Sequence, residues 1–460
     1  MKKTSKVKGV LEVLAVIGLI LVIPLFFAIK TAADKQEAKN TPMPPAPTAS
    51  EVPETNSVTT AQRPPQCTFP LAQITRVEST PEEYTFSEPK VVLTAPDGNP
   101  LNVAQWLPDN QQVLVTEGLR NQYVDNNNTA IQQSISLYNL ETGESKVYAI
   151  RAEIYEPPIW QPELNGVVYP AFNFTSLDKV KGIRIFTREL RISYGNPDAT
   201  QLLADKLQFP FVVKPSKNEI LYLSDKKLSK LDKSLKKLSL ASFDPDQWDY
   251  AKSRRNNKPV SYQMAWQPGT ALVFLYSGGG TSLQGGYAFV LNTDTGHICE
   301  LELGGPVDRA AQWSSDGRYL AFAKATSYTG FSDTIDLVVL DSITGNLRTI
   351  DVVPPDVKGQ HYVTDLTWTP DNLHLLVFVN IPSTYDSFET MHHKLYFVGF
   401  ATGQSAPLFP EFKSFFAEGI PGSNNFVWSP DGLKLLVRCP VMKHPATNRF
   451  CLISVQRTKH

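Results

Sequence analysis

Histidine is the residue type in this chain best suited to bind a metal, and its spacing decides whether a site can form. His392 and His393 are adjacent, and in a strand their side chains would point to opposite faces of the sheet. A metal site needs ligands that converge, and the sequence has no Cys-x-x-Cys motif to supplement the histidines. We therefore expect solvated histidines and neither a metal nor a cofactor. The seven histidines are His297, His361, His374, His392, His393, His444 and His460.

A serine nucleophile is the second chemistry to consider. A hydrolase elbow needs Gly-x-Ser-x-Gly between a strand and a helix, but Ser282 lies between Gly280 and Gly285 at the wrong spacing. Asp316, followed by Gly317, fits a turn better than a catalytic box. We assign no catalytic residue, and an enzyme is the less favoured hypothesis.

Four cysteines in 460 residues are too few for a fold built on disulfides, although an exported location permits individual disulfides. Cys439 ends one strand of an expected hairpin, and Cys451 begins the neighbouring strand. We therefore expect them to form a disulfide. Cys67 and Cys299 either form a second disulfide or remain free thiols. A bond between Cys439 and Cys451 would pin the last hairpin of the chain.

A motif built around tryptophan predicts the elements that position these residues. Its complete form is Trp428-Ser429-Pro430-Asp431-Gly432, followed by an apolar run. Pro fixes φ, Asp bonds to nearby backbone and Gly accepts a positive φ, so each copy is a tight turn between two strands. The copies occur at steps of 47 to 60 residues and carry, at the tryptophan position, Trp106, Trp160, Lys214, Trp266, Trp313, Trp368 and Trp428.

A second hairpin, often with a Thr-Gly turn such as Thr344-Gly345, follows most copies. Each unit is then a four-stranded antiparallel sheet with two apolar faces, and radial stacking covers both faces. The sequence predicts an all-β, seven-bladed β-propeller, with six or eight blades as alternatives. The last copy has room for three strands, and Lys90–Leu93 would supply the fourth. Residues 226–240 fit an amphipathic helix by spacing, but the repeat favours strands.

The copies at Trp313–Gly317 and Trp428–Gly432, each followed by an apolar strand, resemble TolB-type (WD-like) β-propeller repeats. The resemblance covers roughly residues 68–460. It implies a propeller and, by default, contact with another protein at one propeller face. TolB-type proteins have six blades and a separate N-terminal domain, and this sequence departs from both features.

The N-terminus predicts a membrane anchor and a spacer. Val10–Ile29 is an apolar run of about 30 Å as a helix, with Glu12 as its one charge. A cleaved signal peptide is the alternative. Lysines before the run favour a cytoplasmic N-terminus, which places the rest of the chain outside the cell membrane. The expected parts are a cytoplasmic tail (1–8), a transmembrane signal anchor (9–30), a Pro-rich disordered linker (31–66) and the propeller (67–460).

Long connections between the second and third strands of the units should all leave from one face. They are expected near 118–132, 171–182, 276–287, 324–334, 380–394 and 439–450. Irregular loops on a rigid scaffold commonly form binding surfaces. The candidate binding residues in them are Tyr123, Tyr276, Tyr328, Phe331, Tyr385, Phe388, His393, Lys443, His444 and Arg449.

Composition limits the remaining functions. The 44 basic and 45 acidic residues give a net charge of −1, which argues against a nucleic-acid partner. We expect a membrane-anchored, extracytoplasmic module, periplasmic or extracellular, that binds a protein or serves as a scaffold. The alternative is a propeller hydrolase or lyase that acts on a glycan, lactone or peptide in its central channel.

Overall fold

A computed structural model describes most of the unit formed by residues 60–460. The described residues are 64–74, 80, 82–95, 101–118, 132–153, 157–178, 183–207, 211–214, 219–243, 263–276, 288–305, 307–325, 334–353, 361–381, 393–412, 415, 424–440 and 449–459. All the regular elements within these residues are strands. The expected membrane span and linker lie outside them. Among the described residues there is no helix with the length and apolarity needed to cross a membrane.

The strands form four-stranded antiparallel meanders, here called units. The first two are β3 (Leu101–Trp106), β4 (Gln112–Gly118), β5 (Gln132–Asn139) and β6 (Ser145–Glu153), then β7 (Ile159–Gln161), β8 (Gly166–Asp178), β9 (Ile183–Ser193) and β10 (Thr200–Ala204). The next two are β11 (Val212–Val213), β12 (Ile220–Ser224), β13 (Lys227–Leu231) and β14 (Lys237–Ser242), then β15 (Gln263–Trp266), β16 (Leu272–Tyr276), β17 (Ala288–Asn292) and β18 (Ile298–Leu301).

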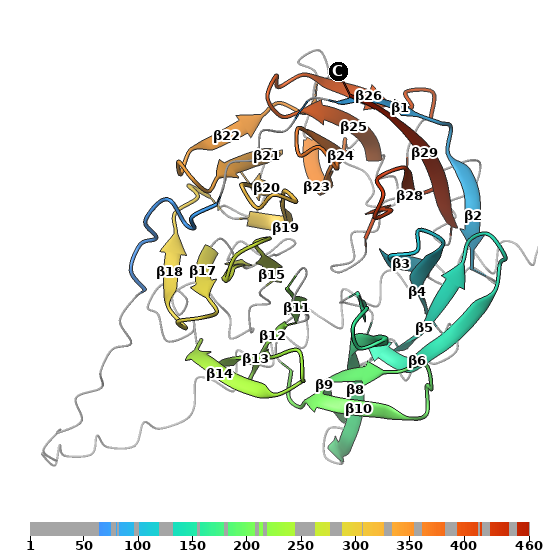
Figure 1. Cartoon of the computed structure of the whole chain (residues 1–460), viewed down its shortest axis with the longest axis vertical. Helices are drawn as coiled ribbons and strands as arrows, with labels where there is room; N and C mark the ends of the chain where they lie inside the picture. Colours follow the sequence, from blue (N-terminus) through green and yellow to red (C-terminus); the bar gives the residue numbers. More distant parts are fainter. Residues whose placement is uncertain are drawn as a thin grey trace, which may run out of the picture. The chain divides into compact units, whose positions relative to one another are not determined.

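The remaining units follow in chain order. They are β19 (Val307–Trp313), β20 (Tyr319–Ala325), β21 (Thr334–Asp341) and β22 (Leu347–Ile350), then β23 (His361–Trp368), β24 (His374–Asn380), β25 (His393–Gly399) and β26 (Ser405–Leu408). The closing unit combines β27 (Phe426–Trp428), β28 (Lys434–Arg438) and β29 (Arg449–Lys459) with β1 (Glu82–Phe86) and β2 (Lys90–Thr94). Figure 1 shows the units around a common centre, with the first strand of each nearest to it, which is a β-propeller.

The prediction of seven separate blades is wrong at the level of strand pairing, because the strands form five hydrogen-bonded sheets, two of them with eight strands. In one, β6 meets β8 at Ala152 and Ala171. In the other, β21 pairs in parallel with β23 at residues 334–335 and 361–362. In the first sheet the short strand is β7, the first strand of its unit, and in the second sheet it is β22, the fourth strand of its unit. Each short strand leaves part of an edge uncovered, and the neighbouring unit pairs with that part.

Two other expectations concern individual segments. Residues 226–240 form strands β13 and β14 around a turn at Asp232, as the repeat predicted. Residues 171–182 were expected to be a loop, but β8 continues to Asp178 and β9 begins at Ile183. The prediction of a loop was wrong because Phe172, Phe174 and Thr175 in this run favour strands.

The hydrophobic core lies between neighbouring units. Phe274 of β16 packs in one buried cluster with Trp313 and Phe322 of the next unit. Phe378 of β24 likewise shares a cluster with Val437 and Ile453 of the closing unit. Second strands such as β16 are buried along their whole length because apolar side chains on both faces meet a neighbouring sheet.

Three of the motif tryptophans link first strands to one another. Trp313 Nε1 donates a hydrogen bond to the backbone oxygen of Ala265 at 3.2 Å, and Trp368 Nε1 donates to that of Gln312 at 3.0 Å. In each pair the acceptor directly precedes the tryptophan of the previous unit. Trp106 Nε1 closes the series with a bond of 2.9 Å to Val427. The tryptophan is therefore both a core residue and a connector between units.

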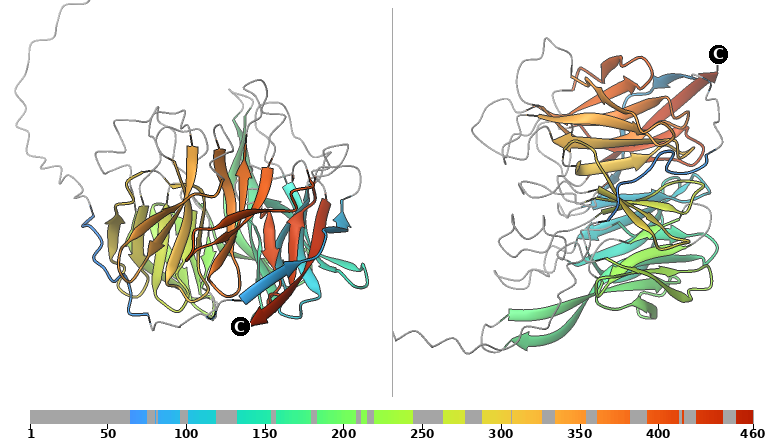
Figure 2. Two further views of the ribbon diagram at one scale, coloured as in Figure 1. Left: turned by 90° about the horizontal axis from the view of Figure 1, so that it is seen from above. Right: turned by 90° about the vertical axis from the view of Figure 1, so that its left-hand side faces the viewer.

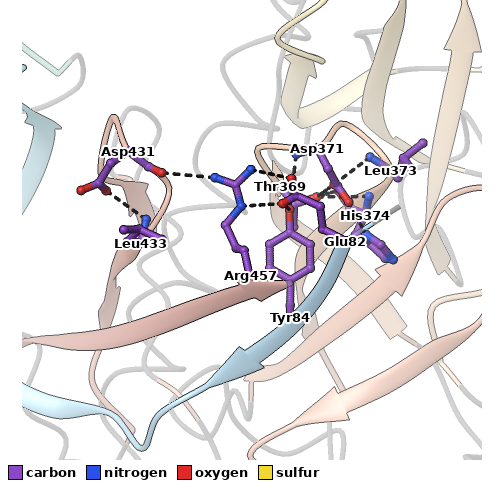
Figure 3. A network of polar contacts seen from close by, with 9 residues as sticks. All are labelled: Glu82, Tyr84, Thr369, Asp371, Leu373, His374, Asp431, Leu433 and Arg457. Atoms are coloured by element: carbon purple, nitrogen blue, oxygen red, sulfur yellow. Dashed lines mark hydrogen bonds and ion pairs between the residues drawn. The ribbon is translucent and has the colours of Figure 1, made fainter. Parts of the chain in front are cut away.

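The N-terminal strands complete the closing unit, and the predicted contribution of Lys90–Leu93 is confirmed. β2 pairs antiparallel with residues 449–452 of β29, and β1 pairs with residues 455–459. Arg457 on β29 donates to both oxygens of Glu82 on β1 at 2.6 and 3.0 Å, and to the backbone oxygen of Asp431 at 3.2 Å (Figure 3). This ion pair joins the two ends of the described chain.

Tyr84 on β1 reaches the turn of the β23–β26 unit (Figure 3). Its hydroxyl accepts a hydrogen bond from the Asp371 backbone N–H at 3.3 Å. Burial, followed by the charge of Asp371, raises the pKa of the Tyr84 phenol, which therefore stays neutral. His374 Nδ1 lies 3.1 Å from Asp371 Oδ2. The network is explained by ring closure, since each group in it has a partner within the protein.

Candidate interaction face

The two faces of the propeller differ in the length of their connections. First-to-second and third-to-fourth connections, such as 107–111 and 140–144, are short turns on one face, here called the turn face. Second-to-third connections leave from the opposite face, here called the loop face. Five of them are long and lie largely outside the described residues: 119–131, 277–287, 326–333, 381–392 and 439–448. The described residues that frame the loop face are the ends of the second strands and the starts of the third strands.

Most of the predicted binding residues lie outside the described residues. These are Tyr123, Tyr328, Phe331, Tyr385, Phe388, Lys443 and His444. Tyr276, His393 and Arg449 are described, and all three lie where a strand meets the loop face. They come from three different units, and Phe415 bridges His393 to Pro440, which follows Cys439.

Tyr276 is a correction to the sequence-based prediction of an exposed binding residue. It ends β16 and is 3% exposed. Its hydroxyl donates a hydrogen bond to Gln263 Oε1 at 2.7 Å, and its ring stacks on Phe274 with centroids 5.1 Å apart. The residue belongs to the strand and its core because the apolar run of β16 extends one position further than the loop boundary suggested.

His393 is also buried, with 4% exposure, which again differs from the expectation of a surface contact. It begins β25, and its Nδ1 lies 3.4 Å from Thr364 Oγ1 of β23. Its backbone oxygen accepts a hydrogen bond from Phe415 at 2.8 Å. Phe415 therefore pairs with the backbone of His393.

Arg449 is exposed and is the predicted residue that best fits a contact surface. It begins β29, where its backbone oxygen accepts a hydrogen bond from the Cys439 N–H at 3.2 Å. Cys439 and Cys451 form a disulfide, and Cys67 and Cys299 form a second one, so all four cysteines are paired. The first disulfide fixes the base of connection 439–448 beside Arg449.

Asp365 on the inner strand β23 is a titratable residue that sequence reasoning missed. It is half-buried. Its Oδ2 accepts hydrogen bonds from the N–H and the side-chain amide of Asn425 at 3.2 and 2.9 Å, and Oδ1 accepts from Leu366 at 2.8 Å. Burial raises the pKa of Asp365 to about 6, although the bonds from Asn425 and the charge of Arg438 act in the opposite direction.

The Asp365 contact belongs to a wider link between three units. Asn425 joins the closing unit to Asp365, while the adjacent Asn424 donates to Asn102 Oδ1 at 3.2 Å and to the Ala104 backbone oxygen at 2.7 Å. The inner strand β27 has three residues, so these side chains supplement its short ladder. The pair Asn424-Asn425 before the last Trp motif was the available sequence signal.

Among the described residues, the β8–β9 hairpin projects from the loop face. β8 has 13 residues and β9 has 11, whereas the other second strands have 5 to 7. Beyond Ala171 and Leu190 no other strand forms a ladder with β8 or β9 among the described residues, and the Leu207 N–H donates a hydrogen bond to the Arg188 backbone oxygen at 2.9 Å. Figure 2 shows this green ribbon reaching beyond the level of the neighbouring strands. We call residues 172–178 and 183–189 the ribbon.

The base of the ribbon is braced by polar contacts. Glu189 is 5% exposed, and its oxygens accept hydrogen bonds from Asn173 Nδ2 at 2.7 Å and Arg191 Nε at 2.8 Å. Arg191 also donates to Thr200 Oγ1 on β10 at 3.0 Å. The ribbon is thus held at its root by side chains from three strands.

Comparison with known proteins identifies structures of similar fold. No family model and no curated protein matches the chain. A putative TolB from Agrobacterium tumefaciens is 12% identical, with 82% of this chain and 99% of that chain covered and a TM-score of 0.40. A GH74 xyloglucanase from Xanthomonas campestris is also 12% identical, with 80% and 55% covered and a TM-score of 0.49.

The propeller domain of the Trilobed protease from Pyrococcus furiosus is 9% identical, with 78% and 95% of the two chains covered and a TM-score of 0.41. The chain is therefore similar to TolB and to other β-propellers. At this level of similarity the neighbours carry no argument about function. Within the described residues there is also no group of three or more His, Cys, Asp or Glu arranged to hold a metal ion.

Proposed function

We propose that this protein is a membrane-anchored, extracytoplasmic β-propeller that binds a protein partner through its loop face. The observation that carries the proposal is the difference between the two propeller faces. One face consists of short turns fastened to one another. The other carries the long connections and the ribbon.

The turn face is occupied by contacts within the protein. Asn372 Oδ1 accepts hydrogen bonds from the Ser315 N–H and hydroxyl at 2.7 and 3.0 Å, across two units. Gln267 Nε2 donates to the Gly317 backbone oxygen at 2.7 Å, again between units. Residues engaged in this way are poorly placed to contact a partner. Connections that are free to vary in length and sequence are the usual location of binding residues.

The ribbon supports a protein partner through its composition. Phe174 pairs with Phe186, and Phe172 pairs with Arg188. Aromatic residues and arginine are enriched in protein interfaces. A two-stranded ribbon is marginally stable by itself, and an uncovered strand edge readily pairs with another chain. We expect a partner strand to pair with the backbone of the ribbon beyond Arg188.

The extracytoplasmic location is proposed from two observations. The apolar run Val10–Ile29 is long enough to span a bilayer. All four cysteines are paired, and disulfides persist mainly in oxidising compartments. Alkaline extraction of membranes should leave the protein in the pellet. A maleimide reagent should label its cysteines only after the disulfides have been reduced. Labelling of the unreduced protein would contradict the proposed location.

We also propose that the ring has seven blades, counted as four-stranded units. Each eight-stranded sheet divides into two meanders joined through one or two residue pairs. Each meander contains one copy of the tryptophan motif. Electron microscopy of the purified protein, viewed down the ring axis, would count the blades directly.

Shortening the ribbon tests the proposed binding face. Asn173 pairs with Thr187, so replacing residues 174–186 by Asn-Gly would close the hairpin with a two-residue turn. Partners would be crosslinked in intact cells, purified with the full-length protein and quantified by mass spectrometry. We expect the ribbon variant to lose most of the partner that the wild type retains.

The matched control carries changes on the turn face. Glu141→Lys and Glu144→Lys alter exposed residues of one short turn. This control should retain the partner at the wild-type level. Equal recovery with the ribbon variant and the wild type, or loss in the control alone, would contradict binding through the loop face.

Asp365 is the observation that favours the alternative, an enzyme. A carboxyl group with a pKa of about 6 can act as a general acid near neutral pH. Glycoside hydrolysis normally needs a second carboxyl group across the bond. If the protein hydrolyses or eliminates a glycan, lactone or peptide, Asp365→Asn should abolish the activity while leaving partner recovery intact.

A further inference from the structure

The N-terminal part of the propeller runs along the outside of several units before it enters β1. We define the belt as residues 64–74 and 82–94. At its start, Pro65 accepts a hydrogen bond from the Glu300 N–H at 2.8 Å, and the Cys67 N–H donates to the Glu300 oxygen at 2.9 Å. The belt thus covers the outer edge of β18, where Cys67 is bonded to Cys299.

The belt next crosses the β19–β22 unit. The Leu71 N–H donates a hydrogen bond to the Ser342 backbone oxygen at 3.0 Å. Phe69 packs against Gly345, where an added Cβ would lie 2.7 Å from the Phe69 ring. Cys67, Leu71 and Ala72 also pack against the apolar cluster shared by this unit and its neighbour. The second contact is therefore both hydrogen-bonded and apolar.

The belt then reaches the β23–β26 unit and the closing unit. The Tyr84 ring contacts His374 and Phe397 with centroids 5.6 and 5.7 Å away, and Phe86 contacts Phe397 at 5.5 Å. β1 and β2 form the ladder with β29. Figure 1 shows this blue path from the neighbourhood of β18 to that of β29. The belt touches four consecutive units.

We propose that the Cys67–Cys299 disulfide is a pin that keeps the propeller closed by holding the belt at its far end. β1 and β2 are the strands that join the first unit to the last. A detached β1 stays tethered to β2 in any case, and with the pin in place it is also held on its N-terminal side, so it has fewer open conformations and a higher effective concentration for re-pairing. Tension from residues before Cys67 passes into β18 and does not reach β1. The proposal is independent of the partner and of the loop face.

Hydrogen exchange of the full-length protein tests the pin, with β1 (82–86) as the reporter. The double variant Cys67→Ser/Cys299→Ser should exchange its β1 amides about tenfold faster than wild type, because opening of this strand is no longer countered by the pinned belt. Strand β24 should exchange at the wild-type rate. The matched control, Cys439→Ser/Cys451→Ser, removes the other disulfide and should leave residues 64–74 protected.

A second arm covers the case in which the double variant fails to fold. A protease site in place of residues 75–79 allows the belt to be cut after folding, with both disulfides intact. Cutting should accelerate exchange in β1 to the same degree. If β1 exchange changes less than about twofold after cutting, or if residues 64–74 are released in the double variant while β1 stays protected, the belt and the closure are independent and the proposal is overturned.

Discussion

Replacing Asp365 by asparagine should remove a pH-dependent cost of folding. In the native protein, burial raises the pKa of this carboxyl group from its ordinary 3.8 to about 6. Between these two pH values the folded protein keeps a proton that the unfolded chain has lost. The free energy of unfolding therefore falls as the pH rises through this range, and the stabilising effect of the protonated form is present below pH 3.8 and gone above about pH 6.

The size of the effect follows from the shift. A difference of about 2 pKa units, at 1.36 kcal/mol per unit, gives about 3 kcal/mol between pH 3.8 and 7. This is an upper limit, because Asp365 is half-buried and water screens part of the charge. Asparagine has no such titration. The substitution also removes an oxygen that accepts hydrogen bonds from Asn425, or places an NH₂ group there. This should lower the free energy of unfolding by about 1–3 kcal/mol at every pH.

Urea unfolding of the full-length protein in mild detergent, followed by tryptophan fluorescence at several pH values from 4 to 7, measures the effect. The Asp365→Asn variant should be less stable than wild type at pH 4, and the gap should narrow or reverse by pH 7. Asp109→Asn is the matched control with the opposite trend. Although burial works against it, hydrogen bonds from Gln112 and Gln111 lower the pKa of this exposed turn carboxyl group. A constant difference between Asp365→Asn and wild type at every pH would refute the reasoning.

Three further changes test the packing between units. Trp368→Phe removes a bond to Gln312 and should cost about 1 kcal/mol more in urea unfolding than Trp428→Phe, whose indole N–H has no partner among the described residues; equal costs would argue against the connecting role. Gly432→Ala should lower the melting temperature more than Gly269→Ala, because both have positive φ but the added Cβ lies 2.6 Å from Pro370 in the first and meets nothing within 4 Å in the second. Asp371→Asn should destabilise at pH 7 but lose its effect as the pH falls below 3.8. Burial disfavours the charged form of Asp371, but hydrogen bonds from His374 and Thr369 lower its pKa overall. A destabilisation that persisted at low pH would contradict this lowered pKa.

Strand content, turn positions and the closing strand could be predicted from the sequence because each depends on local chemistry. The turn at Trp428–Gly432 requires Asp431, which accepts hydrogen bonds from Ser429 and Leu433, and Gly432, which has φ of +69°. Second strands such as β16 are apolar at every position because both of their faces are covered. These features repeat, so each copy supports the prediction of the others.

The sheets and the loop-face residues could not be predicted in the same way. The join between β21 and β23 depends on how far β22 extends along its neighbour, which no residue type determines. Tyr276 and His393 were assigned to loops, but each lies within a strand by one position and is buried there. An error of one or two residues at a strand end exchanges a surface contact for a core residue.

The difference between the turn face and the loop face indicates where residues can change with little effect on the fold. Turn-face residues such as Asn372 and Gly317 contact the neighbouring unit directly, so a change in one turn disturbs two units. A change in a second-to-third connection affects the unit that carries it and the adjoining part of the ring. The belt also limits the effect of such a change on the ring, because the first and last units are held together by contacts on the outside of the ring as well as by the inner strands. If the protein binds a partner through the loop face, as proposed above, the binding residues are expected where the repeat pattern stops.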